Sequence, residues 1–161
     1  MERILPSPLD KNFRQSAIKL IESASQRFYI IEGDLSSLLL PDLQFALYGV
    51  IPRVEGCVYG TEEVSPDLRN YAVSIGLETY VGKTLLLNNF IVIDGKHFIK
   101  FTKNGRDTDS IGTRQGELHY NSPTKVKEID GLFNQLKSLS ERITSVDKTK
   151  DPYWQFLYQK H

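Results

Sequence analysis

Two adjacent amides, Asn88 and Asn89, interrupt an apolar run that leads to Asp94-Gly95. Asp-Gly between two apolar runs is typical of a two-residue hairpin turn with positive φ angles, so residues 83–103 are predicted to form a β-hairpin. Neighbouring strand residues point to opposite faces of a sheet. At least one amide therefore meets a buried environment, where it needs a hydrogen-bond partner. This pattern makes the hairpin a candidate wall of a binding site.

The Gly82-Lys83-Thr84 triplet ends like a phosphate-binding loop, but the rest of that motif is missing. The GxxxxGK[ST] motif needs a glycine at position 77, where this chain has Leu77, and a helix after the lysine. The sequence predicts a strand after Lys83 instead. We therefore reject a P-loop.

Metal binding finds little support in the residues that could serve as ligands. The histidines have no spacing that would recruit zinc, and two aspartates resemble a calcium loop that lacks its glycine and glutamate. These residues are His97, His119, His161, Asp107 and Asp109. No metal and no other cofactor is predicted.

The overall composition is that of an ordinary globular protein of 161 residues, with 40% hydrophobic residues, 25% charged residues and a formal net charge of zero. A molecule with zero net charge has no overall long-range electrostatic attraction to nucleic acid or to anionic membranes. Cys57 is the only cysteine, so no intrachain disulfide can form, and an apolar strand without a basic neighbour predicts a buried core thiol. The chain has neither a signal-peptide core near its start nor a run long enough to span a bilayer, so we expect a cytoplasmic protein.

A local basic cluster surrounds the hairpin and the loop after it, with Phe98 and Phe101 between the charges. Strand alternation places Lys96, Phe98 and Lys100 on one face, which could bind phosphates or stack on bases. Lysines on an outer strand also protect a sheet edge from pairing with another chain. The nucleic-acid-binding alternative rests on Lys96, Lys100, Lys103, Arg106 and Arg114.

Periodicity predicts the elements that must position these residues. In chain order they are a helix over residues 10–24, a strand over 28–31, a helix from Ser36 or Ser37 through Pro41 to a terminator at Gly49, a strand over 51–59, a short helix within 60–76, a strand over 78–81, the hairpin, a strand over 112–119, a helix from Asn121-Ser122-Pro123 to Leu139, and an aromatic tail over 146–161 that docks on the domain. Early βαβ units favour parallel pairing, whereas the later strands form an antiparallel meander. The predicted fold is one α/β domain over residues 1–161, a sandwich of a mixed, partly parallel sheet flanked by helices.

This run of elements resembles one half of the phospholipase D-like fold. The family's amphipathic helix and short strand match Phe13–Ile31, its helix ending in Gly-Val matches Leu38–Val50, and its second strand matches Arg53–Val58. The family's catalytic strand carries HxKxxxxD and ends in a turn much like Ile93–Lys96. The resemblance covers most of the chain.

Alignment on Asp94 places the family's histidine at Leu87, its lysine at Asn89 and its following serine near Thr102. In that family the histidine attacks phosphorus and the lysine stabilises charge on the phosphate oxygens. Leu87 can do neither, Asn89 offers only a neutral donor, and His97 is out of register. The resemblance therefore implies a protein that is not an enzyme, with a phosphodiesterase or nuclease of the same family as the alternative.

Non-catalytic versions of this fold serve as binding modules, and the chain also resembles the effector-sensing domain of TrmB-type transcription regulators. The sensor-like region starts near residue 10, so we expect a sensory or regulatory domain without its own DNA reader. The resemblance implies a homodimer, since half-units of this fold commonly pair about a two-fold axis. The partner would be a small molecule or another protein. The predicted ligand-binding residues lie where the central strands meet the loops: Glu32, Asp34, Asn89, His97, Lys100 and Thr102.

Overall fold

The structure is a computed structural model that describes residues 11–102 and 115–144. The predictions for Asp10, for Lys103, Arg106 and Arg114, and for the aromatic tail lie outside the described residues.

A seven-stranded mixed sheet forms the centre of the molecule, with strand order β6-β5-β4-β1-β2-β3-β7. The strands are β1 (Arg27–Ile31), β2 (Glu55–Thr61), β3 (Glu78–Gly82), β4 (Asn89–Ile93), β5 (His97–Thr102), β6 (Gln115–His119) and β7 (Ser140–Ile143). Strands β1, β2 and β3 pair in parallel, and the other pairs are antiparallel. The mixed, partly parallel α/β sheet predicted from the sequence is therefore confirmed.

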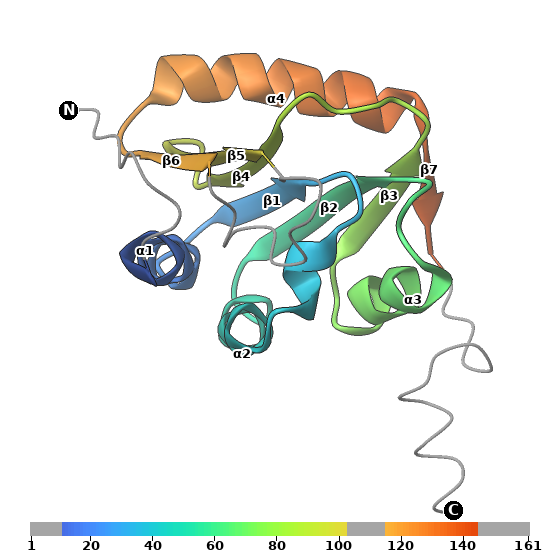
Figure 1. Ribbon diagram of the computed structural model, residues 1–161, viewed down its shortest axis with the longest axis horizontal. Coiled ribbons are helices and arrows are strands. Elements are labelled where there is room, and N and C mark those ends of the chain that lie inside the picture. The colour runs from blue at the N-terminus through green and yellow to red at the C-terminus, as the bar shows by residue number, and fades with distance from the viewer. Residues whose placement is uncertain (1–10, 103–114, 145–161) are drawn as a thin grey trace, which may run out of the picture.

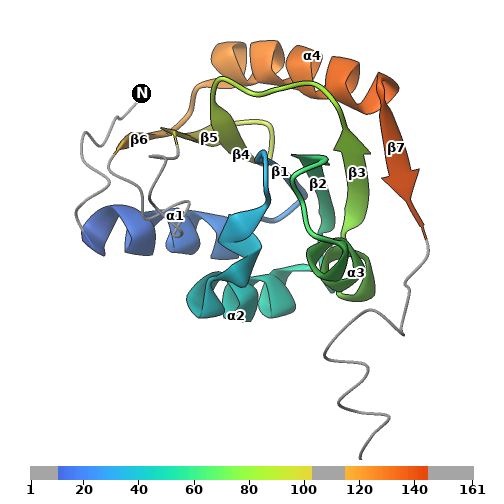
Figure 2. The ribbon, with the colours of Figure 1, turned by 45° about the vertical axis from the view of Figure 1, so that its right-hand side comes forward.

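Helices cover both faces of this sheet (Figure 1). The helices are α1 (Lys11–Glu22), α2 (Pro41–Val50), α3 (Pro66–Ser74) and α4 (Pro123–Ser138), and a short 3-10 helix, η1 (Ser36–Leu39), precedes α2. Helices α1, α2 and α3 lie on one face, whereas α4 is the one helix of the described residues that crosses the other face (Figures 1 and 2). Two apolar cores result, one on each side of the sheet.

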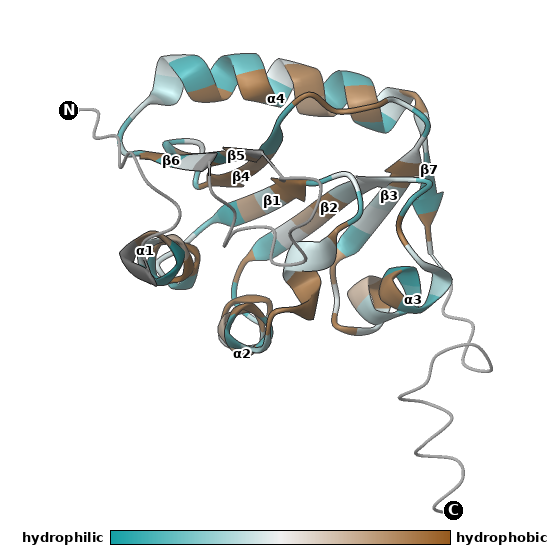
Figure 3. Ribbon diagram, in the orientation of Figure 1, coloured by the Kyte–Doolittle hydropathy of each residue, from teal (hydrophilic) through white to brown (hydrophobic). Residues whose placement is uncertain are grey.

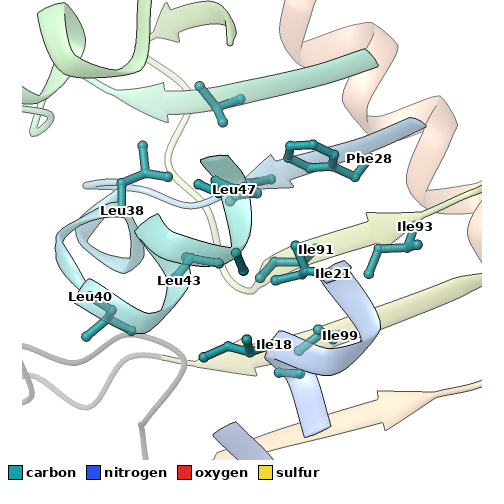
Figure 4. Close-up of a cluster of buried hydrophobic side chains, with 14 of the residues drawn as sticks. Ile18, Ile21, Phe28, Leu38, Leu40, Leu43, Leu47, Ile91, Ile93 and Ile99 are labelled. Atoms are coloured by element: carbon teal, nitrogen blue, oxygen red, sulfur yellow. The ribbon is translucent and has the colours of Figure 1, made fainter. Parts of the chain in front are cut away.

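The larger core lies between the sheet and α1–α3 (Figure 4). Its side chains alternate along the strands with those of the second core, because successive strand residues face opposite ways. Hydrophobic and hydrophilic residues alternate along the ribbon of α4 (Figure 3), and the hydrophobic Val126, Ile129, Phe133 and Leu136 are buried. Buried members of the larger core include Ile21, Phe28, Leu43, Leu47, Ile91 and Ile99; the second core, under α4, includes Tyr29, Ile31, Tyr59, Val92, Phe98, Val126, Ile129 and Phe133.

Three helices begin at a proline, Pro41, Pro66 and Pro123, where the missing N–H costs no hydrogen bond. Ser65 caps α3 by accepting a hydrogen bond from the Leu68 N–H at 3.2 Å. The predicted stop at Gly49 is wrong. Helix α2 runs through that glycine to Val50, because nothing crowds the position and tertiary packing outweighs the weak helix propensity of glycine.

Three strand predictions need correction. Residues 83–88 form a loop, so the first hairpin strand starts only at Asn89. The second strand starts at Glu55, after a turn, where the sequence predicted residue 51. Strand β7 was not predicted, and it pairs antiparallel with β3 at the sheet edge.

Candidate functional site

The carboxyl ends of β1 and β2 meet the start of β4 at one edge of the sheet, which we call the carboxyl edge. The loop after β1 opens here with Glu32, which is buried. Its Oε1 accepts a hydrogen bond from the Ser37 N–H at 2.9 Å, and its Oε2 accepts one from the Ser37 hydroxyl at 2.7 Å. A buried carboxylate needs such partners, and here they fix the start of η1.

Asp34 and Asn89 hold the same loop. The Asn89 Oδ1 accepts a hydrogen bond from the Gly33 N–H at 3.2 Å, and the Asp34 Oδ1 accepts one from the Ser36 N–H at 3.0 Å. The hydroxyl of buried Thr61 at the end of β2 donates to the Gly33 carbonyl at 2.9 Å. The structure thus brings three predicted residues together with backbone groups as their hydrogen-bond partners.

Thr102 ends β5 at this same edge, because its strand neighbour Phe101 pairs with Asn89. The Thr102 side chain lies outside what the structure describes.

His97 lies at the opposite end of the hairpin, where it pairs with Ile93. Its Nδ1 accepts a hydrogen bond from the Asn121 N–H at 2.9 Å, and its ring meets the Tyr120 ring edge-on at 5.8 Å. Burial lowers the pKa of His97, with the Asp94 charge acting against this shift. His97 therefore does not join Glu32, Asp34 and Asn89, and it serves to anchor the approach to α4.

Asp94 forms the turn between β4 and β5. Its φ of 56° and the Gly95 φ of 67° are the two positive angles of the predicted hairpin turn. The Asp94 carboxylate accepts hydrogen bonds from the backbone N–H groups of Ser25, Gln26 and Arg27 at 3.0, 2.8 and 3.1 Å. Burial alone would raise its pKa, but these donors outweigh burial and lower the pKa below the ordinary value. Asp94 thereby ties the hairpin to the start of β1.

Lys100 lies on the α4 face of the sheet, in a groove of about 280 Å³ that also includes Lys125 of α4. Phe90 and the stacked rings of Phe98 and His119, whose centroids are 4.2 Å apart, line this groove. Glu117 and Glu128 line it as well, and the Glu117 Oε2 lies 3.0 Å from the His119 Nε2. The groove thus combines aromatic rings with charges of both signs.

Lys96 does not share this groove. It is exposed in the hairpin turn, four residues from Lys100 and therefore about 13 Å away along an extended strand.

The loop between β3 and β4, residues 83–88, passes beside α4 at the carboxyl edge (Figures 1 and 2). Leu86 turns inward and packs on the core under α4, and the Thr84 carbonyl accepts a hydrogen bond from the Tyr59 hydroxyl at 3.4 Å. Leu85 and Leu87 point outward, and they are 81% and 95% exposed. The exposed leucines of this loop were not predicted, because three consecutive leucines are typical of a buried strand.

Among residues 11–102 and 115–144, no group of three or more histidine, cysteine, aspartate or glutamate side chains could hold a metal ion. No helix in the same described ranges is both long and apolar enough to cross a membrane.

No protein-family model matches the sequence, and a comparison with curated proteins finds no match. Solved structures do match. Nuc from Salmonella typhimurium, a phospholipase D family member, aligns with a TM-score of 0.72 and 13% identity over 90% of this chain and 99% of its own. NucT from Helicobacter pylori aligns with a TM-score of 0.68 and 11% identity over 89% of this chain and 99% of its own.

A third match is TrmBL2, an archaeal chromatin protein described with a novel mode of DNA binding. It aligns with a TM-score of 0.61 and 14% identity over 88% of this chain, which spans 54% of TrmBL2. Identities this low describe the fold alone. The chain has a phospholipase D-like fold that resembles both the Nuc-type structures and TrmBL2.

Proposed function

We propose that this chain is a non-catalytic phospholipase D-like module, and that its carboxyl edge is a contact surface for a second copy of the chain. The observation that carries the proposal is Leu87. Alignment on Asp94 gives this position to the family's histidine, and here it holds an apolar side chain that is 95% exposed.

The groups at this edge are poorly suited to phosphodiester chemistry. Leu87 has no lone pair with which to attack phosphorus, and Asn89 carries no charge to stabilise phosphate oxygens. The Asn89 oxygen already accepts a hydrogen bond from the Gly33 N–H. His97 is held by Asn121 at the far end of the hairpin. A module of this kind would act through what it binds, as a sensory or regulatory domain does.

The exposed leucines favour a partner at the same place. A single exposed leucine is ordinary on a protein surface, but Leu85 and Leu87 stand on one short loop whose middle residue, Leu86, is anchored in the core. Burying a leucine side chain contributes about 2 kcal/mol. A two-fold axis near this loop would bring the same leucines of both copies together, as closed dimers do.

Sedimentation velocity tests the contact surface. We expect a particle of twice 18.4 kDa for the wild type and a monomer for the double variant Leu85→Glu/Leu87→Glu. Phe45→Glu is the matched control, because Phe45 is 81% exposed on α2, across the sheet. A wild type that stays monomeric at high concentration, or a dimer that the leucine variant leaves intact, would refute the contact surface.

A second candidate function, nucleic-acid binding, is favoured by the groove that holds Lys100 and Lys125 beside aromatic rings. Such a combination suits phosphates and stacked bases, and TrmBL2 is described as binding DNA. This function predicts salt-sensitive anisotropy changes with labelled single-stranded DNA. Lys100→Gln/Lys125→Gln should weaken the binding about tenfold, whereas Lys96→Gln, outside the groove, should not. Flat titration curves at low salt would dismiss this candidate.

A further inference from the structure

A second hollow, of about 230 Å³, lies between the latter half of α4 and the amino ends of β1, β2 and β3. We propose that this pocket, which we call the amino-end pocket, binds a small zwitterion that carries one ammonium and one carboxylate group. The pocket lies away from the carboxyl edge, and the proposal does not depend on dimer formation.

The parallel strands build the floor of the amino-end pocket by their register. Arg27 of β1 pairs with Glu55 of β2. Two residues further along β2, Cys57 pairs with Glu78 of the next strand, β3. Helix α4 crosses above these residues and supplies the opposite wall. The wall consists of Asp130, Phe133, Asn134 and Lys137.

Carboxylates of the protein form the side of the pocket that would hold the ligand's ammonium group. The Asp130 Oδ1 accepts a hydrogen bond from the Tyr29 hydroxyl at 2.5 Å, and Glu78 accepts one from the Tyr80 hydroxyl. An ionised carboxylate has about four acceptor positions, so one tyrosine donor leaves most of them open. Glu55 stands exposed at the start of β2 and completes this side of the pocket.

Two basic residues of the protein line the side of the pocket that would hold the ligand's carboxylate group. The Lys137 Nζ lies 4.7 Å from the centre of the Phe133 ring and 5.8 Å from that of Tyr80. Contact with ring faces holds this ammonium group in place and leaves its N–H donors free to turn toward a ligand. Arg27, at the start of β1, also lines the pocket, and its Nη2 lies beside Gly95 of the hairpin turn.

Charge and size together select the ligand class. A pure anion would meet three carboxylates, Glu55, Glu78 and Asp130, whereas a pure cation would meet Arg27 and Lys137. A zwitterion satisfies both sets of charges. An engineered cavity of about 150 Å³ holds benzene, so this larger pocket has room for a molecule the size of a free amino acid.

Cys57 makes the occupancy of the amino-end pocket measurable, because it lines the pocket and is the only cysteine in the chain. Burial, followed by the charge of Glu78, raises the pKa of the Cys57 thiol to about 12, against the opposing charges of Lys137 and Arg142. The thiol therefore reacts slowly, and labelling should be followed at about pH 9. A bound ligand should slow the labelling further.

Calorimetry at low salt with glycine, 4-aminobutyrate and 6-aminohexanoate tests the proposal. We expect at least one of these zwitterions to bind, and butylamine and butyrate, which carry one charge each, to bind at least tenfold more weakly. Glu78→Gln and Lys137→Met should each weaken zwitterion binding at least tenfold. Glu62→Gln is the control, because Glu62 is an exposed carboxylate on the loop after β2 and does not line the pocket.

The labelling rate of Cys57 locates the binding. The zwitterion should slow modification in the wild type and in Leu85→Glu/Leu87→Glu, but not in Glu78→Gln. Binding that leaves the Cys57 rate unchanged, equal affinity for butylamine, or no binding of any of the three zwitterions would overturn the proposal. A wild type that stays monomeric but still binds a zwitterion would count against the proposed contact surface alone.

Discussion

Removing the Asp94 carboxylate should loosen the hairpin from the start of β1. Asp94→Gly isolates this effect, because glycine adopts the φ of 56° at this position without strain. Asp94→Asn is the milder variant. It tolerates the same backbone angle and keeps one acceptor oxygen, but it lacks the charge.

The expected cost follows from the three backbone N–H groups that donate to Asp94, at 2.8 to 3.1 Å. Hydrogen bonds to a charged group contribute about 1.5–3 kcal/mol each, but these donors lie near the surface, where water can replace the carboxylate. We take about 1 kcal/mol for each, which gives about 3 kcal/mol for Asp94→Gly and roughly half of that for Asp94→Asn. A loss of 3 kcal/mol corresponds to a Tm lower by about 10 °C for a domain of this size.

Urea unfolding at several pH values measures both the size and the origin of this effect. The pKa of Asp94 is lowered in the folded state, so its contribution is fully present above the ordinary value of 3.8 and disappears as the pH falls through the folded-state pKa. The difference between the wild type and Asp94→Asn should therefore be constant from pH 8 to about pH 5 and shrink below about pH 4. A cost below 1 kcal/mol for Asp94→Gly, or a difference that persists unchanged at about pH 2.5, would refute this reasoning.

Two further predictions concern other parts of the fold. Burial lowers the pKa of His97 below 6.5, so the free energy of unfolding should fall as the pH drops from about 6.5 toward the folded-state pKa. Urea titrations should show this slope in the wild type and not in His97→Asn; equal slopes would contradict it. Gly60→Ala should destabilise the fold by about 2 kcal/mol, because the new Cβ would lie 2.4 Å from Val64 Cγ2. Thermal unfolding measures this loss. An unchanged Tm would contradict the prediction and show that the loop around Val64 moves to make room for the new Cβ.

Local signals in the sequence predicted the parts of the fold that depend on local chemistry. Asp94-Gly95 predicted the hairpin turn because few residue pairs accept two positive φ angles. The apolar spacing of Val126, Ile129 and Phe133 predicted α4, and these residues are buried under it. Strand β7 escaped prediction because its four residues, Ser140–Ile143, show no alternation of apolar and polar side chains.

The candidate site was only partly predictable, since it depends on how strands pair. Glu32 and Asp34 follow a parallel strand, so their place at the carboxyl edge could be inferred from the sequence. The predicted turn at Asp94-Gly95 already places His97 at the opposite end of the hairpin from Asn89. The antiparallel pairing of β4 with β1, which separates His97 from Glu32, has no local signal in the sequence. The prediction that Leu87 lies in a buried strand was also wrong, because composition cannot distinguish a buried leucine from an exposed one without the tertiary fold.

The most direct test of the central claim is a phosphodiesterase measurement on the wild-type protein, with bis(4-nitrophenyl) phosphate and single-stranded DNA as substrates. We predict no turnover above that of a protein-free control, because Leu87 and Asn89 stand where alignment on Asp94 places the nucleophile and the charge-stabilising group. Asn89→Ala and His97→Ala are the matched variants. Turnover that either variant abolishes would contradict the account and place catalysis at the carboxyl edge or at the hairpin turn.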